Sequence, residues 1–129
     1  DRLLLQPAER APLPAFDARS YSRPKDFVPA RAADRITIDA DAVVGDLHIR
    51  RVAAGDRFAP FGMPKGTKLV SDYLTDRHRS VLEKQAATVV CDERGIVWLV
   101  GETVDRRVAV HRSTQTILDI RLLPPDREA

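Results

Sequence analysis

The clearest signal along this chain is a series of short segments in which apolar and polar residues alternate. Residues 36–39 (Ile-Thr-Ile-Asp) and 46–50 (Asp-Leu-His-Ile-Arg) follow this pattern, and their β-branched residues favour strands. In the second segment, Leu47 and Ile49 should face the core. Both segments are therefore predicted to be strands of a half-buried sheet, with a turn at residues 39–41 after the first.

The second half of the chain has strand character almost throughout. The run 96–100 is almost fully apolar, which predicts a strand buried on both faces. The segment Asp-Glu-Arg-Gly at residues 92–95 predicts a hairpin turn, because Gly95 can adopt a positive φ. Strands are predicted at residues 88–91, 96–100, 107–111 and 116–122.

One principal helix is predicted between these two groups of strands. Apolar residues at 69, 70, 73 and 74 recur with helical spacing up to about Arg77, and they would form one buried face. Thr67 is the expected N-cap, because its hydroxyl can accept a hydrogen bond from a first-turn amide. Residues 80–86 could add one more helical turn.

The segment before this helix, residues 55–66, holds three glycines and two prolines. Its apolar residues Phe58, Phe61 and Met63 need burial, so an ordered loop is expected. The fold class that follows from all these elements is α+β and mostly β. It consists of six or seven short strands and one principal helix.

The division of the chain follows from its prolines. Five of the nine prolines lie within residues 1–30, which argues against regular helix there. We therefore expect residues 1–35 to be a linker or arm from a preceding domain, with a short strand at 3–5. Residues 36–123 should form the domain, and residues 124–129 a charged tail. The absence of an initiator methionine indicates a chain cut from a larger protein.

The charge is unevenly distributed. The net charge is +2, yet residues 50–79 contain seven Lys or Arg against three acids, so this segment carries +4 and the rest −2. A local basic stripe suggests a polyanionic partner. Its alternative is an ordinary solvated face, which charge alone favours.

The compartment is inferred from cysteine usage and hydropathy. The single Cys91 excludes an internal disulfide and fits a reducing environment. No segment approaches the roughly 20 apolar residues of a membrane helix, and the first residues do not form a signal peptide. A cytoplasmic protein without membrane contact is expected.

The residues that could serve in catalysis or metal binding do not have the spacing that known motifs require. The three histidines lie roughly 30 residues apart without a cysteine pair, so zinc is not expected. The start of a calcium loop at Asp39 and Asp41 is followed by Val43 and ends on Arg50, which is not the required pattern. The loop 62–68 lacks Walker spacing, and Cys91 in mid-strand has no catalytic partner. The fragment itself is therefore not expected to be an enzyme or to hold a cofactor.

Several motifs resemble one known family in order and content. They are Gly-Asp-Arg-Phe-Ala-Pro-Phe-Gly-Met at residues 55–63, Lys-Leu-Val-Ser-Asp at 68–72 and Ile-Val-Trp-Leu-Val-Gly at 96–101. This succession resembles the C-terminal domain of bacterial tRNA(Ile)-lysidine synthetases, also called synthases. The resemblance covers about residues 36–122. It implies the small β-rich fold shared with the β chain of bacterial phenylalanyl-tRNA synthetases.

The resemblance also implies a function. These enzymes convert the wobble cytidine of tRNA(Ile) to lysidine by adenylating the base with ATP and letting free lysine displace AMP. That chemistry belongs to an N-terminal catalytic domain, which would be a partner within the same chain. The C-terminal domain is expected to grip the tRNA acceptor stem. ATP and lysine would then be used by the catalytic domain, with no cofactor in this fragment.

The candidate RNA-binding residues lie in the basic segment. RNA stems are recognised through phosphates, 2′-hydroxyls and the shallow minor groove, which suits cations on a rigid platform. Arginines could fork onto phosphates, lysines could act as point charges, and amides at the helix N-terminus could bind an anion. The set is Arg50, Arg51, Arg57, Lys65, Gly66, Thr67 and Lys68.

Each residue has a structural alternative. Arg57 could instead pair with Asp56 or Asp72. The aromatic residues Phe58, Phe61, Tyr73 and Trp98 are expected in the core. The alternative function is a protein–protein or dimerisation module, such as a homodimer, that uses apolar edge strands near residues 96–100.

Overall fold

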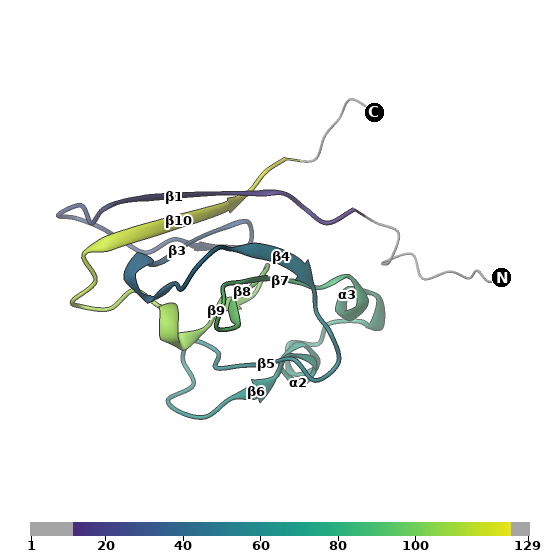
Figure 1. The fold of residues 1–129 in the computed structure, drawn as a ribbon. Coiled ribbons are helices and arrows are strands. Elements are labelled where there is room, and N and C mark those ends of the chain that lie inside the picture. Colours follow the sequence, from purple (N-terminus) through teal and green to yellow (C-terminus); the bar gives the residue numbers. More distant parts are fainter. Residues whose placement is uncertain (1–11, 125–129) are drawn as a thin grey trace.

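Two antiparallel sheets pack against each other in the structure, a computed structural model that describes residues 12–124. Figure 1 shows the first sheet as one layer, with the end of the described chain continuing from β10. Its register aligns Ile120 of β10 with Ile36 of β3, so both side chains enter the core together. The strand order is β1 (Phe16–Ser22), β10 (Thr116–Leu122), β3 (Arg35–Asp39) and β2 (Arg31–Ala32).

The second sheet forms the middle of the molecule. Residues of β7 and β8 alternate between two cores: Val90 and Val97 pack toward the first sheet, whereas Val89 and Leu99 pack on the other side. Burial on both faces explains why these strands are apolar runs instead of alternating segments. The strand order is β4 (His48–Arg51), β7 (Thr88–Cys91), β8 (Ile96–Leu99) and β9 (Thr103–Val104).

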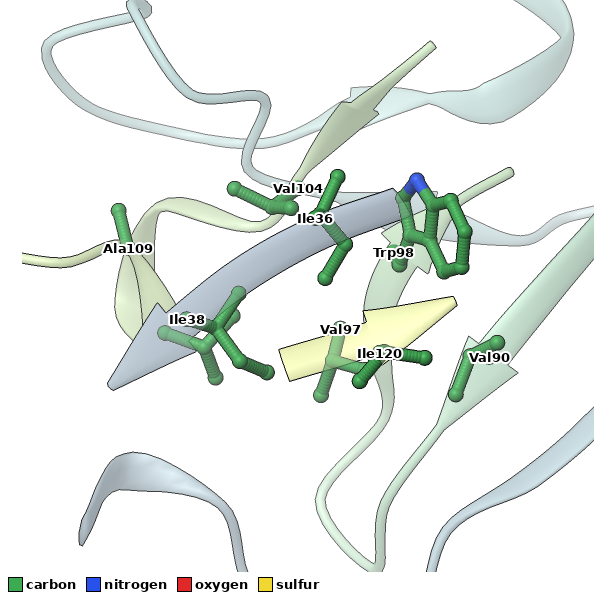
Figure 2. Packing of buried hydrophobic residues seen from close by; sticks show 9 residues of the cluster. Ile36, Ile38, Val90, Val97, Trp98, Val104, Ala109 and Ile120 are labelled. Atoms are coloured by element: carbon green, nitrogen blue, oxygen red, sulfur yellow. The ribbon is translucent and has the colours of Figure 1, made fainter. Parts of the chain in front are cut away.

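The core between the two sheets is centred on Trp98. Figure 2 shows its indole beside Ile36 of β3, with Val97 and Ile120 close by. Trp98 and Ile120 have no exposed surface. Because both sheets contribute side chains to one cluster, neither sheet can keep its apolar face buried without the other.

A third layer covers the far face of the middle sheet, as Figure 1 shows. Phe58 packs there with its ring edge on Tyr73, at 5.4 Å between centroids. No helix between residues 12 and 124 has the length and apolar content to cross a membrane. The elements of this layer are β5 (Arg57–Phe58), β6 (Lys68–Leu69), α2 (Val70–Asp76) and α3 (Val81–Ala86).

The predicted fold class is confirmed, as are the strands at 36–39, 88–91 and 116–122 and the extra helical turn at 80–86. This turn has a full capping box: Ser80 accepts a hydrogen bond from the Glu83 amide, and the Glu83 carboxylate accepts one from the Ser80 amide. The backbone bond lowers the pKa of Glu83.

The predicted start of the principal helix is wrong. The helix begins at Val70, and Leu69 at its N-cap has extended backbone and no side-chain cap. Thr67 does not cap it, because its hydroxyl accepts a hydrogen bond from Arg57 instead. Residues 68 and 69 form a short strand with β5.

The strand predicted at residues 107–111 is also wrong. This segment begins with a 3₁₀ turn, η2 (Arg106–Val108). Asp105 caps the turn, since its carboxylate accepts a hydrogen bond from the Arg107 amide at 2.9 Å. The short strand β9 just before it completes the middle sheet. The apolar edge expected near residues 96–100 is therefore absent, because β8 lies between β7 and β9.

The linker predicted over residues 1–35 is wrong where the structure describes it from β1 onward. β1 pairs with β10 over seven residues, and β2 pairs with β3. Most β1 side chains are exposed or half-buried, so backbone pairing with a distant strand holds it. The prolines of this region flank β1 and do not interrupt it. The strand predicted at residues 3–5 lies outside the described residues, as does nearly all of the tail at 124–129.

Candidate nucleic-acid interface

Four cations of the basic segment are paired with three acids within the protein. Arg50 binds Asp56 through two hydrogen bonds of 2.8 and 3.2 Å. Burial opposes ionisation of Asp56, but this pair and the Ala53 amide lower its pKa. Lys68 pairs with Asp76, and Arg77 and Arg79 share the buried carboxylate of Glu102. The three carboxylates offset three of these four positive charges, so the group keeps a net charge of +1.

Arg79 and Glu102 also line an open hollow of about 400 Å³ between α2, α3 and the middle sheet. Glu83 is a second acid in its wall, and Ala86 and Leu74 make part of it apolar. The acids offset the arginine, so the hollow is not suited to a polyanion. No group of three or more His, Cys, Asp or Glu side chains between residues 12 and 124 is arranged to hold a metal ion.

A different arrangement surrounds residues 59–67, here called the 59–67 loop. Arg57 donates to the Thr67 hydroxyl at 3.0 Å and to the Thr67 carbonyl at 3.2 Å. From the other side, Arg106 donates to the carbonyls of Met63 at 2.5 Å and Gly66 at 3.2 Å. Two guanidinium groups therefore clamp the loop through neutral oxygens.

The base of the loop is fixed to the segment around Asp105. The buried Asp105 carboxylate accepts a hydrogen bond from the Ala59 amide at 2.9 Å. The Phe61 amide donates to the Val104 carbonyl at 3.0 Å, and the Arg106 amide donates to the Ala59 carbonyl at 2.7 Å. This backbone ladder holds the loop in one conformation before any partner arrives.

Positive charge remains at this loop because no acid between residues 12 and 124 pairs with its cations. Arg57 and Arg106 bind carbonyl and hydroxyl oxygens, which stabilise a guanidinium without cancelling its charge. Within residues 12–124, the exposed Lys65 at the tip makes no hydrogen bond or ion pair. The loop and its two arginines thus present three uncompensated cations on a rigid support.

The predicted site residues fall into two groups. Arg57, Lys65, Gly66 and Thr67 all belong to this loop or its clamp, where Gly66 adopts a φ of 82°. The others lie apart from it in contacts within the protein. Arg50 is paired with Asp56, Arg51 reaches the Ala86 carbonyl at 3.5 Å, and Lys68 is paired with Asp76.

Two expectations about this region are wrong. The amides of Gly66 and Thr67 do not lie at a helix N-terminus, because α2 begins at Val70. Phe61 is not in the core: it is 39% exposed, and the Arg31 guanidinium lies 4.0 Å from its ring centroid. Phe58 is buried as predicted, and Met63 is half-buried. Arg57 pairs with neither Asp56 nor Asp72, the alternative left open above.

Sequence reasoning missed Arg106, the second clamp on the loop. Its signal was the pair of adjacent arginines at 106 and 107, of which only Arg107 lay in a segment assigned to a strand. In the structure, Arg107 is bound instead to the buried Asp92, at 2.6 and 3.0 Å. Arg107 therefore links the η2 turn to the β7–β8 hairpin, whereas Arg106 binds the 59–67 loop.

Known proteins similar to this chain point to one family. A tRNA(Ile)-lysidine synthase of Bacteroides thetaiotaomicron is 38% identical over 98 residues, which are 76% of this chain and 23% of that protein. One of Parabacteroides distasonis is 40% identical over 86 residues, 67% of this chain and 19% of that protein. A crystal structure of the TILS C-terminal domain has a TM-score of 0.62 at 22% identity, covering 89% of this chain and 95% of that chain.

The chain is homologous to the C-terminal domain of tRNA(Ile)-lysidine synthase. It spans less than a quarter of the length of these two curated relatives. No protein-family model matches it.

Several residues of the 55–63 segment have a structural role in this lysidine synthase domain. Asp56 holds Arg50 and accepts a hydrogen bond from the Ala53 amide at 2.8 Å. Phe58 is buried, and Pro60 forms a bridge with Asp105. These residues therefore hold the 59–67 loop in place. Arg57 is the residue of this segment whose charge no acid offsets within residues 12–124.

Proposed function

We propose that this domain binds the acceptor stem of tRNA(Ile) through the 59–67 loop and its clamping arginines. The observation that carries the proposal is the set of three cations, Arg57, Lys65 and Arg106, whose charge no acid cancels on a hydrogen-bonded loop. The four paired cations of the basic segment are offset in large part by three acids within the fold.

The geometry suits an RNA stem for two physical reasons. A-form RNA presents phosphates and 2′-hydroxyls across a shallow minor groove, which surface cations can reach without entering a deep groove. A loop that is already held by backbone hydrogen bonds loses little conformational freedom on binding, so more of the contact energy appears as affinity. Arg57 and Arg106 also keep guanidinium N–H groups that can reach phosphate oxygens.

The proposal includes the rest of the enzyme. A catalytic domain of the same chain would use ATP and lysine to convert the wobble cytidine of tRNA(Ile) to lysidine. In that arrangement the present domain holds the tRNA far from the anticodon and takes no part in the chemistry. The protein would work in the cytoplasm, where its tRNA substrate is found. A homodimer is not favoured, because β8 lies inside its sheet.

We expect Lys65→Ala to weaken binding of an acceptor-stem minihelix and to reduce the log–log salt slope by about one, for one lost phosphate contact. Adding Arg57→Ala should reduce the slope by about one more. Lys65 makes no contact inside residues 12–124, so its removal leaves the fold intact. Fluorescence anisotropy at several salt concentrations measures both effects.

Arg19→Ala is the matched control for these variants. Arg19 lies on β1 at the edge of the first sheet, its side chain is 69% exposed, and it is 3.9 Å from the Asp17 carboxylate. Its loss changes the net charge by the same amount as Lys65→Ala and should leave the slope unchanged. Equal effects of Lys65→Ala and Arg19→Ala would mean that the RNA responds to net charge alone, which would overturn the assignment of the loop.

A further inference from the structure

Arg31 and Phe61, a residue of the 59–67 loop, form an exposed stack. The Arg31 guanidinium lies 4.0 Å from the centroid of the Phe61 ring. Phe61 is 39% exposed and Arg31 is exposed. Within residues 12–124, the Arg31 side chain makes no hydrogen bond or ion pair. Its cation–π contact is with a ring that belongs to neither core cluster.

Two fixed backbone segments hold this stack in place. Arg31 belongs to β2, where it pairs with Ile36 of β3 at the edge of the first sheet. The Phe61 amide is bonded to the Val104 carbonyl at 3.0 Å, and the turn after it uses Gly62 at a φ of 98°. Arg31 therefore lies on the edge strand of the first sheet and Phe61 on a loop bonded to β9 of the middle sheet.

A second arginine–phenylalanine contact in the protein has a different character. Arg23 lies 5.5 Å from the Phe27 centroid, and its guanidinium donates to the carbonyls of His111 and Thr114 at 2.8 and 3.0 Å. That arginine ties the ends of β1 and β10 together. The Arg31 side chain makes no such hydrogen bond within residues 12–124, so its position over Phe61 does not serve to join two segments of the backbone.

We propose that the Arg31–Phe61 stack receives an unpaired nucleobase next to the bound stem, such as one in the single-stranded 3′ end of an acceptor arm. This inference rests on the proposed function. A guanidinium lying on an aromatic ring presents its outer planar face, on which a base can stack. The cavity beside Arg31 is only about 30 Å³, too small for a base, so the base lies on the open face of the stack.

The surrounding charge agrees with this occupant. The stack shares Phe61 with the 59–67 loop. Lys65 of this loop and Arg106, which binds it, can hold the phosphates of the same RNA strand. Glu102 is the acid that lines the small cavity, and Arg77 and Arg79 neutralise it. Stacking combined with cations along the backbone is the usual means of holding single-stranded nucleic acid.

The test compares two RNAs on the 129-residue chain: a blunt acceptor-stem duplex and the same duplex with an unpaired 3′ tail. We expect the tailed RNA to bind about 5- to 100-fold more tightly, the usual range for stacking one or more bases. Arg31→Lys keeps the charge but loses the planar group, and Phe61→Leu keeps an apolar side chain but loses the ring. Both should bring the ratio of the two affinities close to one.

The same variants should leave the affinity for the blunt duplex and the salt slope for both RNAs unchanged, because stacking does not release counterions from phosphates. Arg19→Lys at the opposite edge of the same sheet is the matched control and should keep the wild-type ratio. Melting curves verify that each variant is folded.

Three outcomes would overturn the proposal. Equal wild-type affinity for both RNAs would show that no unpaired base is held, and the stem-binding role would stand. A tail preference that survives both Arg31→Lys and Phe61→Leu would locate the tail elsewhere on the domain. Failure of the folded protein to bind either RNA would overturn the stem-binding function together with this inference.

Discussion

Truncating Trp98 to alanine should lower the free energy of unfolding by about 3–5 kcal/mol, as expected for removing a large aromatic side chain from a packed core. Trp98 has no exposed surface and lies where residues of β3, β8 and β10 meet (Figure 2). A loss of this size is comparable to the whole stability of many small domains. Urea denaturation followed by circular dichroism measures it.

Trp98→Phe should cost less than the alanine variant because it retains most of the apolar volume. Trp98 is remote from solvent, so the phenylalanine variant, once folded, should bind the minihelix as the wild type does. A loss below about 1 kcal/mol for Trp98→Ala would contradict the packing described here. Weak RNA binding by folded Trp98→Phe would contradict the purely structural role of the tryptophan.

Replacing Asp92 with alanine should cost about 3–5 kcal/mol, because it leaves the half-buried Arg107 without its partner. The Asp92 carboxylate binds Arg107 at 2.6 and 3.0 Å and accepts hydrogen bonds from the amides of Val44, Arg94 and Gly95. It thus joins the β7–β8 hairpin to the η2 turn and to the segment before β4. Asp92→Asn, which keeps the shape but not the charge, should cost less.

Asp92 also makes stability depend on pH. Burial opposes its ionisation, but Arg107 and the amides of Val44 and Arg94 outweigh this and lower its pKa to about 2. The unfolded chain should have an ordinary aspartate pKa of about 3.9. A depressed folded pKa stabilises the protein above pH ~4 by about 2–3 kcal/mol, and this contribution is lost as the pH falls toward 2.

Urea titrations at pH 6, 4, 3 and 2 would measure this dependence. The difference in unfolding free energy between the wild type and Asp92→Asn should be largest at pH 6 and should shrink below pH ~4. Asp56 and Asp119 also have lowered pKa values, and their contributions are common to both proteins. A difference that stays constant across this range would mean that Asp92 is not ionised in a specific pair.

The sequence predicts well those strands whose buried side chains appear as a regular pattern of apolar residues. The alternation at residues 36–39 and the apolar run at 96–99 correspond to β3 and β8. At residues 36–39 the side chains in the core follow the strand period, whereas in β8 the adjacent Val97 and Trp98 both pack toward the first sheet. The hairpin at residues 92–95 follows from the same local chemistry, with Asp92 accepting two amides of the turn.

The errors occur where non-local contacts decide the local structure. β1 has little buried surface and exists because β10 lies beside it, which no local pattern can reveal. The start of α2 is displaced because Arg57, ten residues away in sequence, takes the hydroxyl of Thr67. The 3₁₀ turn at Arg106–Val108 replaces an expected strand because Asp105 caps it.

The candidate site was predictable in its location but not in its members. The excess of positive charge at residues 50–79 is visible in the sequence. Which of these cations are neutralised depends on acids brought close by the fold, such as Asp76 for Lys68 and Glu102 for Arg79. Arg106 enters the site from about forty residues away, so only the folded chain shows that it belongs there.

The most direct test of the central claim is the affinity of this domain for a tRNA(Ile) acceptor-stem minihelix, compared with the tRNA(Ile) anticodon stem-loop across a series of salt concentrations. We predict preferential binding of the acceptor minihelix and a log–log salt slope of about −2 to −3, for two to three phosphate contacts at Arg57, Lys65 and Arg106. Equal binding of both RNAs, or no salt-dependent binding by the folded protein, would contradict the account.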